Sequence, residues 1–485
     1  MNPITLIDGY KLDHRRQYPP ETRRVYSNWT PRSSRVEGQD LVVFFGLQAF
    51  IDKYLVARMN QEFFHKPESQ VCEEYVARVN SYLGPNQIGC EHIRGLHKLG
   101  YIPLEFRALP EGTLCPLRVP MLTVENTHDD FAWLVNYYET LISSVLWMPC
   151  TSATTAYRLR LLLEDAAKQT GGDPTFVAWQ GHDFSMRGMA GPEAACLSGA
   201  GHLLSFVGTD TIPAIEFVEQ HYPGNNGLIG ASVAATEHSV MSAGGERSEA
   251  ETFRYLLDLY PSGIVSVVSD TWDLWNVLTR ILPSMKDRIM QREGKLVIRP
   301  DSGDPVKIVC GDAAKDGPAR KGVVELLWDA FGGSVTATGH RQLDPHVGVI
   351  YGDAITYERA KAICDGLRAK GFASTNMVFG VGSYSYQLTT RDTYGFAMKA
   401  TWANVGGTGR DLFKRPVTDD GTKFSAAGRL AVTADGGRLR VIERASVEQE
   451  TASLLTTVWK DGEFKRRSSF AEIRQRLWGH SANWP

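Results

Sequence analysis

The middle third of the chain alternates short apolar runs with amphipathic segments, and this alternation restricts the possible folds more than any other feature. Nearly continuous apolar, β-branched runs predict strands at 175–183, 263–270, 295–301, 347–353 and 376–382. Helical patterns lie between them at 247–260, 271–282, 321–331 and 357–371. Such alternation predicts right-handed βαβ units and a parallel sheet that is buried on both faces. Because no G-x-G-x-x-G follows the first strand and no Walker A loop is present, we expect an irregular α/β barrel rather than a dinucleotide-binding fold.

The length of the chain predicts two structural units. At 485 residues it exceeds what a single hydrophobic core usually supports. Residues 1–150 mix helical patterns with short strands, whereas residues 386–485 are β-rich and end in one helical pattern. We therefore predict that residues 151–385 form the barrel and carry the active site. Residues 1–150 and 386–485 are expected to pack together as a mixed α+β domain.

The composition argues against several classes of protein. The net charge of −3 offers no general attraction for nucleic acid or for an acidic membrane surface. No apolar stretch approaches the roughly 20 residues that span a membrane, and Asp8, Lys11 and Asp13 stand where a signal peptide needs an apolar core. The seven cysteines are scattered and form no C-x-x-C pair, which argues against a zinc site and a disulfide scaffold. We expect a cytoplasmic protein that binds neither nucleic acid nor membranes.

Four of the predicted strands end in aspartate, at positions 183, 270, 301 and 353. In a parallel barrel the carboxyl ends of all strands meet on one face, where such enzymes carry their catalytic residues. Each aspartate alone is explained as a helix cap or a turn residue, but four on one rim favour a site. Arg187 and Arg299 add positive charge beside them. A rim with both signs of charge suits a substrate that carries phosphates and hydroxyls.

Short motifs spread along the chain resemble one enzyme family. They include DGYK (8–11), HDFSMRG (182–188), GTDT (208–211), ATEHS (235–239), IRPDSG (298–303), FGVG (379–382) and TRD (390–392). In this order they resemble the nicotinamide phosphoribosyltransferases from about residue 4 to about residue 475, and IRPDSG with HDF-x-x-RG is the most specific part. The resemblance implies transfer of phosphoribosyl from phosphoribosyl diphosphate to nicotinamide, which gives nicotinamide mononucleotide and diphosphate in NAD salvage.

The resemblance also implies roles for individual residues. Phe184 and, from the second subunit of a homodimer with shared active sites, Tyr10 would sandwich the pyridine ring. Asp210 would accept a hydrogen bond from the carboxamide, and Arg299 would donate to its oxygen or to phosphate. The ribose and its 5′-phosphate would be bound by Asp301, Gly352, Asp353, Gly380, Gly382, Ser383 and, from the partner subunit, Arg391 and Lys399. The diphosphate would be bound by Arg32, Arg187, His238, Lys414 and Lys423. The chain differs from the animal enzymes that it resembles at Gly9, Ser383 and Ala397.

The expected chemistry is displacement at the anomeric carbon through an oxocarbenium-like state. The pyridine nitrogen carries no proton and needs no general base, so catalysis should rest on positioning and electrostatics. The catalytic residues that the resemblance implies are His238, Asp301, Arg299 and Asp270. Mg²⁺ would be bound mainly by substrate phosphates, with help from Asp270 or Asp301. ATP is expected as a coupling co-substrate that phosphorylates His238.

Three alternative functions are considered beside this one. A nicotinate phosphoribosyltransferase shares the fold and the phosphoribosyl donor. A carboxylate about 4 Å from Asp210, however, would cost roughly 4 kcal/mol at an effective dielectric near 20, which favours the amide. A glycoside hydrolase with paired carboxylates fits the surrounding arginines and lysines poorly. A non-catalytic nucleotide-binding protein would not need the full set of acids, arginines and His238.

Overall fold

The computed structural model describes residues 2–224, 227–352, 354–414 and 426–479. Within these ranges the chain divides into two compact units. The first consists of residues 2–154, 218–224 and the described part of 389–479, and the second of residues 155–217 and the described part of 227–388. One boundary falls inside the longest helix, α6 (Glu139–Thr170). Neither α6 nor any other helix among the described residues combines the length and apolar character needed to cross a membrane.

The second unit is built on a seven-stranded sheet in which all neighbouring strands are parallel. Gly208 lies in the strand at one edge of the sheet, and Ala231 lies shortly before the strand at the other edge. A parallel bridge between these two residues joins the edges, so the sheet curls back on itself. This curled parallel sheet confirms the predicted α/β fold. From edge to edge the strands are β7 (Gly208–Thr209), β6 (Gly181–Asp183), β14 (Met377–Val381), β13 (Val347–Tyr351), β10 (Glu293–Arg299), β9 (Ser262–Val268) and β8 (Ala234–Ala235).

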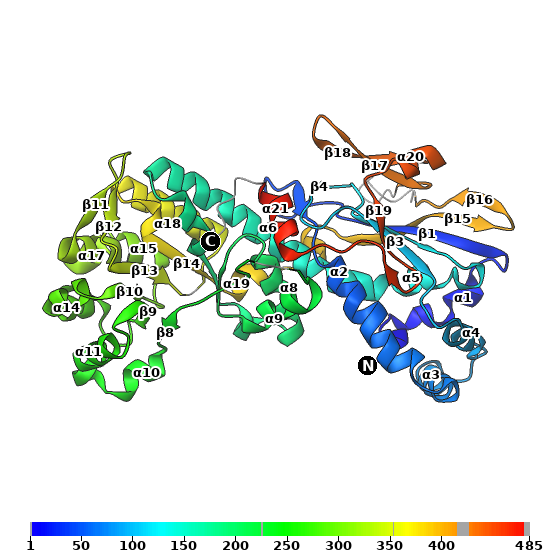
Figure 1. The fold of residues 1–485 in the computed structure, drawn as a ribbon, viewed down its shortest axis with the longest axis horizontal. Coiled ribbons are helices and arrows are strands. Elements are labelled where there is room, and N and C mark those ends of the chain that lie inside the picture. Colours follow the sequence, from blue (N-terminus) through cyan, green and yellow to red (C-terminus); the bar gives the residue numbers. More distant parts are fainter. Residues whose placement is uncertain (1, 225–226, 353, 415–425, 480–485) are drawn as a thin grey trace. The chain divides into compact units, whose positions relative to one another are not determined.

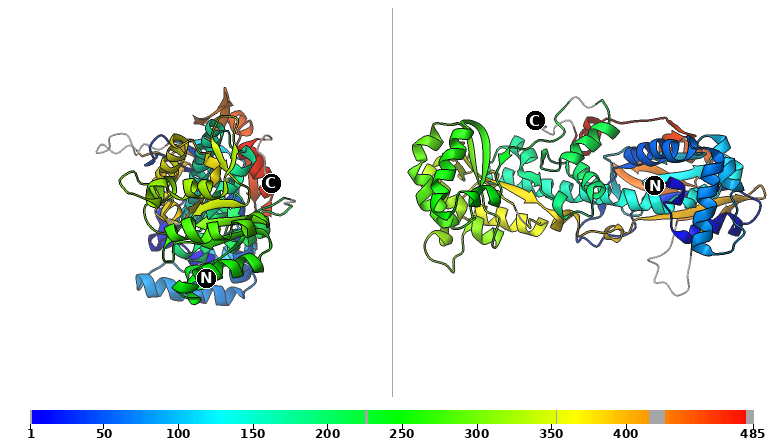
Figure 2. Two further views of the ribbon diagram at one scale, coloured as in Figure 1. Left: turned by 90° about the vertical axis from the view of Figure 1, so that its left-hand side faces the viewer. Right: turned by 90° about the horizontal axis from the view of Figure 1, so that it is seen from below.

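Helices surround these strands (Figures 1 and 2), and those on the outside include α11 (Glu249–Leu259), α14 (Lys286–Met290), α17 (Val323–Phe331) and α18 (Tyr357–Ala369). Alternate residues of a strand point to the same face. On β10 the residues Lys295, Val297 and Arg299 point inward and line a cavity of about 430 Å³. Further elements of this unit are α8 (Pro192–His202), α10 (His238–Ala243), α12 (Leu274–Asn276), α13 (Leu282–Ser284), α15 (Pro305–Cys310), α16 (Pro318–Lys321), α19 (Ser383–Tyr386) and the hairpin of β11 (Gly333–Val335) with β12 (Arg341–Leu343).

The strand predicted at 175–183 is mostly helical, and this prediction was wrong. Residues Pro174–Phe176 form a 3₁₀ turn, α7 covers Val177–Gln180, and only the last three residues pair as β6. The carboxylate of Asp173 accepts a hydrogen bond from the Thr175 backbone N–H, and Pro174 occupies the first helical position. An aspartate cap followed by proline favours a helix start, and it outweighed the β-branched pattern here.

The first unit contains another seven-stranded sheet, which is antiparallel throughout and combines strands from both ends of the chain. Its strands are, in order, β16 (Thr408–Asp411), β15 (Ala397–Val405), β1 (Thr22–Thr30), β5 (Leu122–Asn126), β3 (Leu104–Ala108), β19 (Thr456–Lys460) and β20 (Glu463–Phe464). Two further antiparallel pairs are β2 (Leu41–Val43) with β4 (Leu114–Pro116), which are distant in the chain, and the hairpin of β17 (Leu430–Asp435) with β18 (Arg438–Glu443). The helices include α1 (His14–Gln17), α2 (Leu47–Phe50), α3 (Glu68–Leu83), α4 (Glu91–Leu99), α5 (Leu134–Tyr137), α20 (Val447–Thr451) and α21 (Phe470–Trp478).

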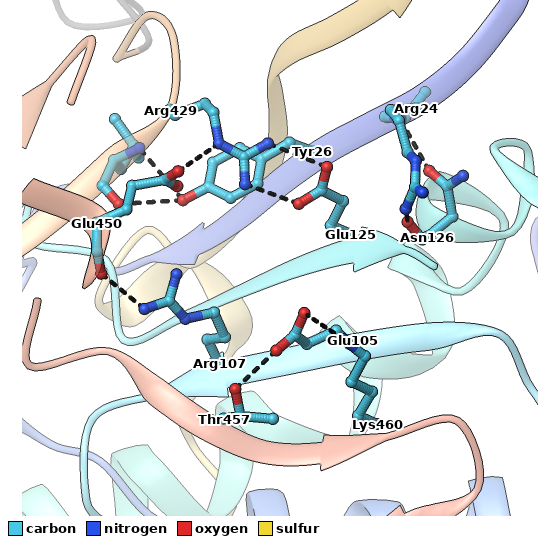
Figure 3. Close-up of polar contacts among 12 residues, drawn as sticks. Arg24, Tyr26, Glu105, Arg107, Glu125, Asn126, Arg429, Glu450, Thr457 and Lys460 are labelled. Carbon is cyan, nitrogen blue, oxygen red and sulfur yellow. Dashed lines mark hydrogen bonds and ion pairs between the residues drawn. The ribbon is translucent and has the colours of Figure 1, made fainter. Parts of the chain in front are cut away.

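One arginine joins distant segments of this unit (Figure 3). Arg429, which immediately precedes β17, donates through Nη1 and Nη2 to the two carboxylate oxygens of Glu125 on β5, at 3.0 and 2.7 Å. Its Nε donates to Glu450 on α20 at 2.6 Å. The guanidinium also lies 4.6 Å from the centre of the Tyr26 ring on β1. These contacts hold the β17–β18 hairpin and α20 against the antiparallel sheet.

Residues 218–224 fall inside the range expected for the barrel but pack in the first unit. The Tyr222 hydroxyl donates to the Glu111 carboxylate at 2.9 Å, and its ring stacks on Phe45 with centres 5.3 Å apart. His221 Nδ1 lies 2.8 Å from Asp52 Oδ2. These partners lie in residues 2–154, so tertiary contacts decide where the segment packs.

Candidate active site

A cavity of about 190 Å³ lies where the barrel strands end. Its walls come from residues that follow β6, β7, β10, β13 and β14, so the carboxyl ends of five strands converge on it. All but Ala354 and Tyr384 were predicted as site residues from the sequence. The lining residues are Phe184, Arg187, Asp210, Arg299, Asp301, Gly352, Ala354, Gly382, Ser383 and Tyr384.

Phe184 lies directly after β6, and its ring lies against the backbone of β14, which pairs with β6 in the sheet. Its N–H donates to the Val381 carbonyl at 3.0 Å. A Cβ on Gly380 would lie 2.6 Å from the Phe184 ring and 2.7 Å from the Tyr351 carbonyl oxygen. Position 380 therefore needs glycine so that the ring can pack there. The predicted contact of Gly380 with phosphate stays a prediction.

Asp210 follows β7 and lines both cavities. Its Oδ1 accepts hydrogen bonds from His182 Nε2 at 2.9 Å and from the Ser232 hydroxyl at 2.6 Å. Partial burial acts to raise the pKa of Asp210, but the contacts with His182 and Ser232 and the positive charge of Arg299 outweigh it. The net pKa lies below the ordinary value of 3.8, so the carboxylate stays ionised at neutral pH.

Arg299 ends β10 and, like Asp210, belongs to the walls of both cavities. Its guanidinium lies 6.0 Å from the centre of the Phe184 ring. Its Nε is buried and has no hydrogen-bond partner among the described residues. A buried donor without a partner is costly, and it marks a position where a ligand acceptor would be stabilising.

The loop after β10 carries Asp301, and Asp270 shapes this loop. Asp270 Oδ2 accepts hydrogen bonds from the backbone N–H groups of Asp301 and Ser302, at 2.8 and 2.7 Å, and from the Ser302 hydroxyl at 2.6 Å. A Cβ on Gly352 would lie 2.5 Å from Asp301 Oδ1, so this glycine makes room for the Asp301 carboxylate. The structure thus gives Asp270 a positioning role for the loop.

His238 begins α10 and is about half exposed, at 49% of its side-chain surface. Its Nε2 lies 3.7 Å from Asp301 Oδ2 and 3.9 Å from Asp270 Oδ1. Its Nδ1 lies 3.2 Å from the Thr271 hydroxyl. The imidazole therefore lies on the same rim as the two carboxylates, and its action on phosphates stays a prediction.

Two carboxylates of this rim, those of Asp270 and Asp301, are suited to bind Mg²⁺. No group of three or more His, Cys, Asp or Glu side chains suited to a metal occurs in the described ranges. Asp270 Oδ1 is buried and, among the described residues, lacks a hydrogen-bond partner. This oxygen lies 3.9 Å from His238 Nε2, which in turn lies 3.7 Å from Asp301 Oδ2. This donor set fits an ion that is bound mainly by substrate phosphates and water.

The other predicted phosphate and pyridine ligands lie in the first unit or outside the described residues. Partial desolvation and the nearby Arg32, Lys414 and Arg391 lower the pKa of the Lys399 ammonium, against the opposing charge of Glu139. These four basic side chains therefore gather in one place. Tyr10 is 64% exposed, which is unusual for a tyrosine that serves only the core. Asp353 and Lys423 lie outside the described residues.

One residue expected on the rim is buried, and two residues that contact Asp210 were not predicted. Asp183 was expected on the rim, but it is fully buried and its Oδ1 accepts the Ser185 N–H at 2.9 Å. His182 and Ser232, which contact Asp210, were not identified. One signal for His182 was available: it stands two residues before Phe184, and alternate residues of a strand share a face. Ser232 gave no comparable signal, because its contact with Asp210 spans 22 residues of sequence.

Family comparisons cover nearly the whole chain. Residues 179–463 match the nicotinate phosphoribosyltransferase (NAPRTase) family, and residues 2–82 match the N-terminal domain of nicotinamide phosphoribosyltransferase. The nicotinamide phosphoribosyltransferase of Acinetobacter baylyi is 52% identical over 98% of this chain and 97% of its own length. That of Mycoplasma pneumoniae is 35% identical over 88% of this chain and 95% of its own.

Two solved structures share the fold. The nicotinate-nucleotide pyrophosphorylase of Pyrococcus furiosus superposes with a TM-score of 0.59 at 17% identity, over 99% of this chain and 95% of that one. Human nicotinic acid phosphoribosyltransferase gives 0.57 at 17% identity, over 99% and 94%. The fold, the residues at the strand ends and the full-length relatives agree. The chain therefore belongs to the nicotinate phosphoribosyltransferase family and, within it, to the nicotinamide phosphoribosyltransferases, which are enzymes of phosphoribosyl transfer.

Proposed function

We propose that this enzyme transfers phosphoribosyl from phosphoribosyl diphosphate to nicotinamide and so forms nicotinamide mononucleotide and diphosphate for NAD salvage. The observation that carries the proposal is the presence of Asp210 and Arg299 on the wall common to both cavities, beside Phe184. The names of the relatives support the same acceptor.

A carboxamide offers an NH2 group that donates and a carbonyl oxygen that accepts, and Asp210 and Arg299 complement these two groups. Asp210 would accept the amide N–H, Arg299 would donate to the amide oxygen, and Phe184 would stack on the pyridine ring. Stacking contributes about 0.5–1.5 kcal/mol beyond area burial, so it mainly orients the ring. Nicotinate would bring a second negative charge within about 4 Å of Asp210, at a cost of roughly 4 kcal/mol for an effective dielectric near 20. The amide is therefore the favoured substrate.

In the reaction the bond from the anomeric carbon to the diphosphate oxygen breaks, and a bond from that carbon to the pyridine nitrogen forms. The nitrogen brings its own lone pair, so no side chain has to remove a proton. Asp301, beside Gly352, would bind the ribose hydroxyls and stabilise the positive charge that develops on the ring. Mg²⁺ bound to the diphosphate would neutralise the leaving group, and Asp270 Oδ1 with Asp301 would be the protein oxygens nearest to it.

The proposed enzyme works as a homodimer with shared sites. Tyr10, Arg391 and Lys399 would serve the barrel of the partner subunit, while Arg32 and Lys414 would bind diphosphate. The gathering of Arg32, Arg391, Lys399 and Lys414 supports this proposal, because concentrated positive charge suits a polyanionic ligand. We propose a cytoplasmic location as well, which the seven scattered cysteines without a C-x-x-C pair support.

ATP would be coupled to the reaction through His238. The carboxylates of Asp270 and Asp301 face Nε2 and favour a proton there, which leaves the lone pair on Nδ1. Nδ1 would attack the γ-phosphorus of ATP, the bond to the bridging oxygen would break, and ADP would leave. The resulting negative charge beside the diphosphate site would then affect the release of products.

A turnover assay tests the proposed function. Purified enzyme is incubated with labelled nicotinamide, phosphoribosyl diphosphate, Mg²⁺ and ATP, and the labelled products are separated. We expect nicotinamide mononucleotide from the wild type and very little from Asp301→Ala, the matched control. Binding of both substrates without product would favour the non-catalytic nucleotide-binding alternative and would contradict the proposal.

A further inference from the structure

The proposed acceptor of the amide, Asp210, is held in place by two other side chains. Oδ1 accepts from His182 Nε2 at 2.9 Å and from Ser232 Oγ at 2.6 Å, and Ser232 Oγ lies 3.4 Å from His182 Nε2. His182 belongs to β6 and Ser232 to the segment before β8, and both line the 430 Å³ cavity beside Asp210. Two of the three side chains thus converge on a single oxygen of the third.

We propose that His182 and Ser232 are specificity-determining positioning residues, which fix Asp210 Oδ1 and leave Oδ2 as the carboxylate oxygen that meets the substrate. This inference rests on the proposed nicotinamide specificity. A carboxylate held at one oxygen by two donors cannot rotate freely, so its other oxygen keeps one direction. An acceptor with a fixed direction distinguishes an amide N–H from a carboxylate oxygen better than a mobile one.

The protonation state of Asp210 also matters for discrimination. A neutral carboxyl group has an O–H, which could donate to the carboxylate of nicotinate and so remove the repulsion. The contacts from His182 and Ser232, with the charge of Arg299, lower the pKa of Asp210 against the effect of burial. Removing either contact weakens the preference for the ionised form. The two residues therefore preserve the repulsion that excludes nicotinate.

The surroundings fix His182 in this orientation. The centre of the His182 ring lies 4.7 Å from the centre of the Phe184 ring. A Cβ on Gly208, its neighbour on β7, would lie 2.8 Å from His182 Nδ1. The imidazole therefore lies between the Phe184 ring and a backbone without a side chain. This packing directs Nε2 to Asp210.

The test compares kcat/KM for nicotinamide with kcat/KM for nicotinate in matched variants. Ser232→Ala and His182→Leu each remove a donor, whereas Ser232→Thr and His182→Gln keep one. We expect the ratio to fall about tenfold or more in each of the first pair, as for the loss of a hydrogen bond to a charged group. In Ser232→Thr and His182→Gln this ratio should stay within about threefold of the wild-type ratio.

The same substitutions are then made in Asp210→Ala, where no side-chain oxygen is left for the two residues to hold. Here we expect them to change the ratio less than about threefold, because they act through Asp210. Equal losses for both pyridines while Asp210 is present, which leave the ratio unchanged, would indicate a merely structural role and overturn the inference. So would an unchanged ratio in Ser232→Ala, which decides the matter alone if the His182 variants fail to fold. A wild type without preference for nicotinamide would instead contradict the proposed function itself.

Discussion

At the scale of single residues, His238 is the side chain on which the proposed ATP coupling depends. We predict that His238→Ala abolishes ATP hydrolysis and lowers the yield of nicotinamide mononucleotide. Nicotinamide binding should be largely retained, because the contacts of His238 are with Asp270, Asp301 and Thr271 and not with Phe184 or Asp210. ADP release and nicotinamide affinity are the two measurements. Hydrolysis at the wild-type rate would exclude His238 from the coupling.

Glu249 predicts a pH dependence of stability. Burial, with the nearby Asp273 and Glu246, raises the pKa of Glu249 from 4.5 to about 7. Folding therefore favours the protonated form, and this contribution is complete below pH 4.5 and is lost as the pH rises through 7. Glu249→Gln imitates the protonated form and should gain roughly 1–2 kcal/mol over the wild type at pH 8 but little at pH 4.5. Thermal midpoints at both pH values measure this, and an equal gain at both would contradict it.

Arg299 and Asp301 could be predicted from the sequence, because they stand at the end of a predicted strand, whereas Phe184 was predicted from the family resemblance. All three line the cavity. His182 and Ser232 could not be predicted as a pair: β6 and β7 are neighbours, but Ser232 meets Asp210 only through the bridge from Gly208 to Ala231. Asp183 also ends its strand, but it is buried in the core.

At the scale of secondary-structure elements, Arg429 holds the β17–β18 hairpin and α20 on the sheet. Replacing it with methionine would leave Glu125 and Glu450 without their shared partner. Breaking a buried pair costs about 3–5 kcal/mol, and because the Arg429 side chain is 24% exposed, we predict roughly 2–4 kcal/mol. Arg440→Met breaks an exposed pair with Asp435 on the same hairpin and should change little. Similar free energies of unfolding for the two variants would contradict this account.

Strands predicted from nearly continuous apolar runs and helices predicted from amphipathic segments were confirmed, as β9, β10, β13, β14, α17 and α18 show. Residues 174–180 were misjudged because a local cap and proline favoured a helix over an apolar run that suits either structure. The packing of residues 218–224 could not be predicted, since it depends on the remote partners Glu111 and Asp52. Local patterns thus determine the elements, and long-range contacts determine where they pack.

At the scale of the whole molecule, the proposed dimer predicts complementation between inactive subunits. Asp301→Ala inactivates the site in the barrel of the same subunit. Arg391→Ala inactivates the site in the barrel of the partner subunit, to which Arg391 would contribute. In an equal mixture half of the dimers are mixed, and one of the two sites in each of these is intact. Activity should therefore return to about a quarter of the wild type after subunit exchange. No recovery after verified exchange would mean that each site is built within one chain.

The central claim, that this enzyme selects nicotinamide through Asp210, is tested most directly by one substitution. The measurement is kcat/KM for nicotinamide and for nicotinate in the wild type and in Asp210→Asn. We predict that the wild type prefers nicotinamide. The variant should lose about 1.5–3 kcal/mol toward nicotinamide and gain a comparable amount toward nicotinate as the repulsion disappears, so the preference narrows by several hundredfold. A wild type that prefers nicotinate, or a variant with an unchanged ratio, would contradict the claim.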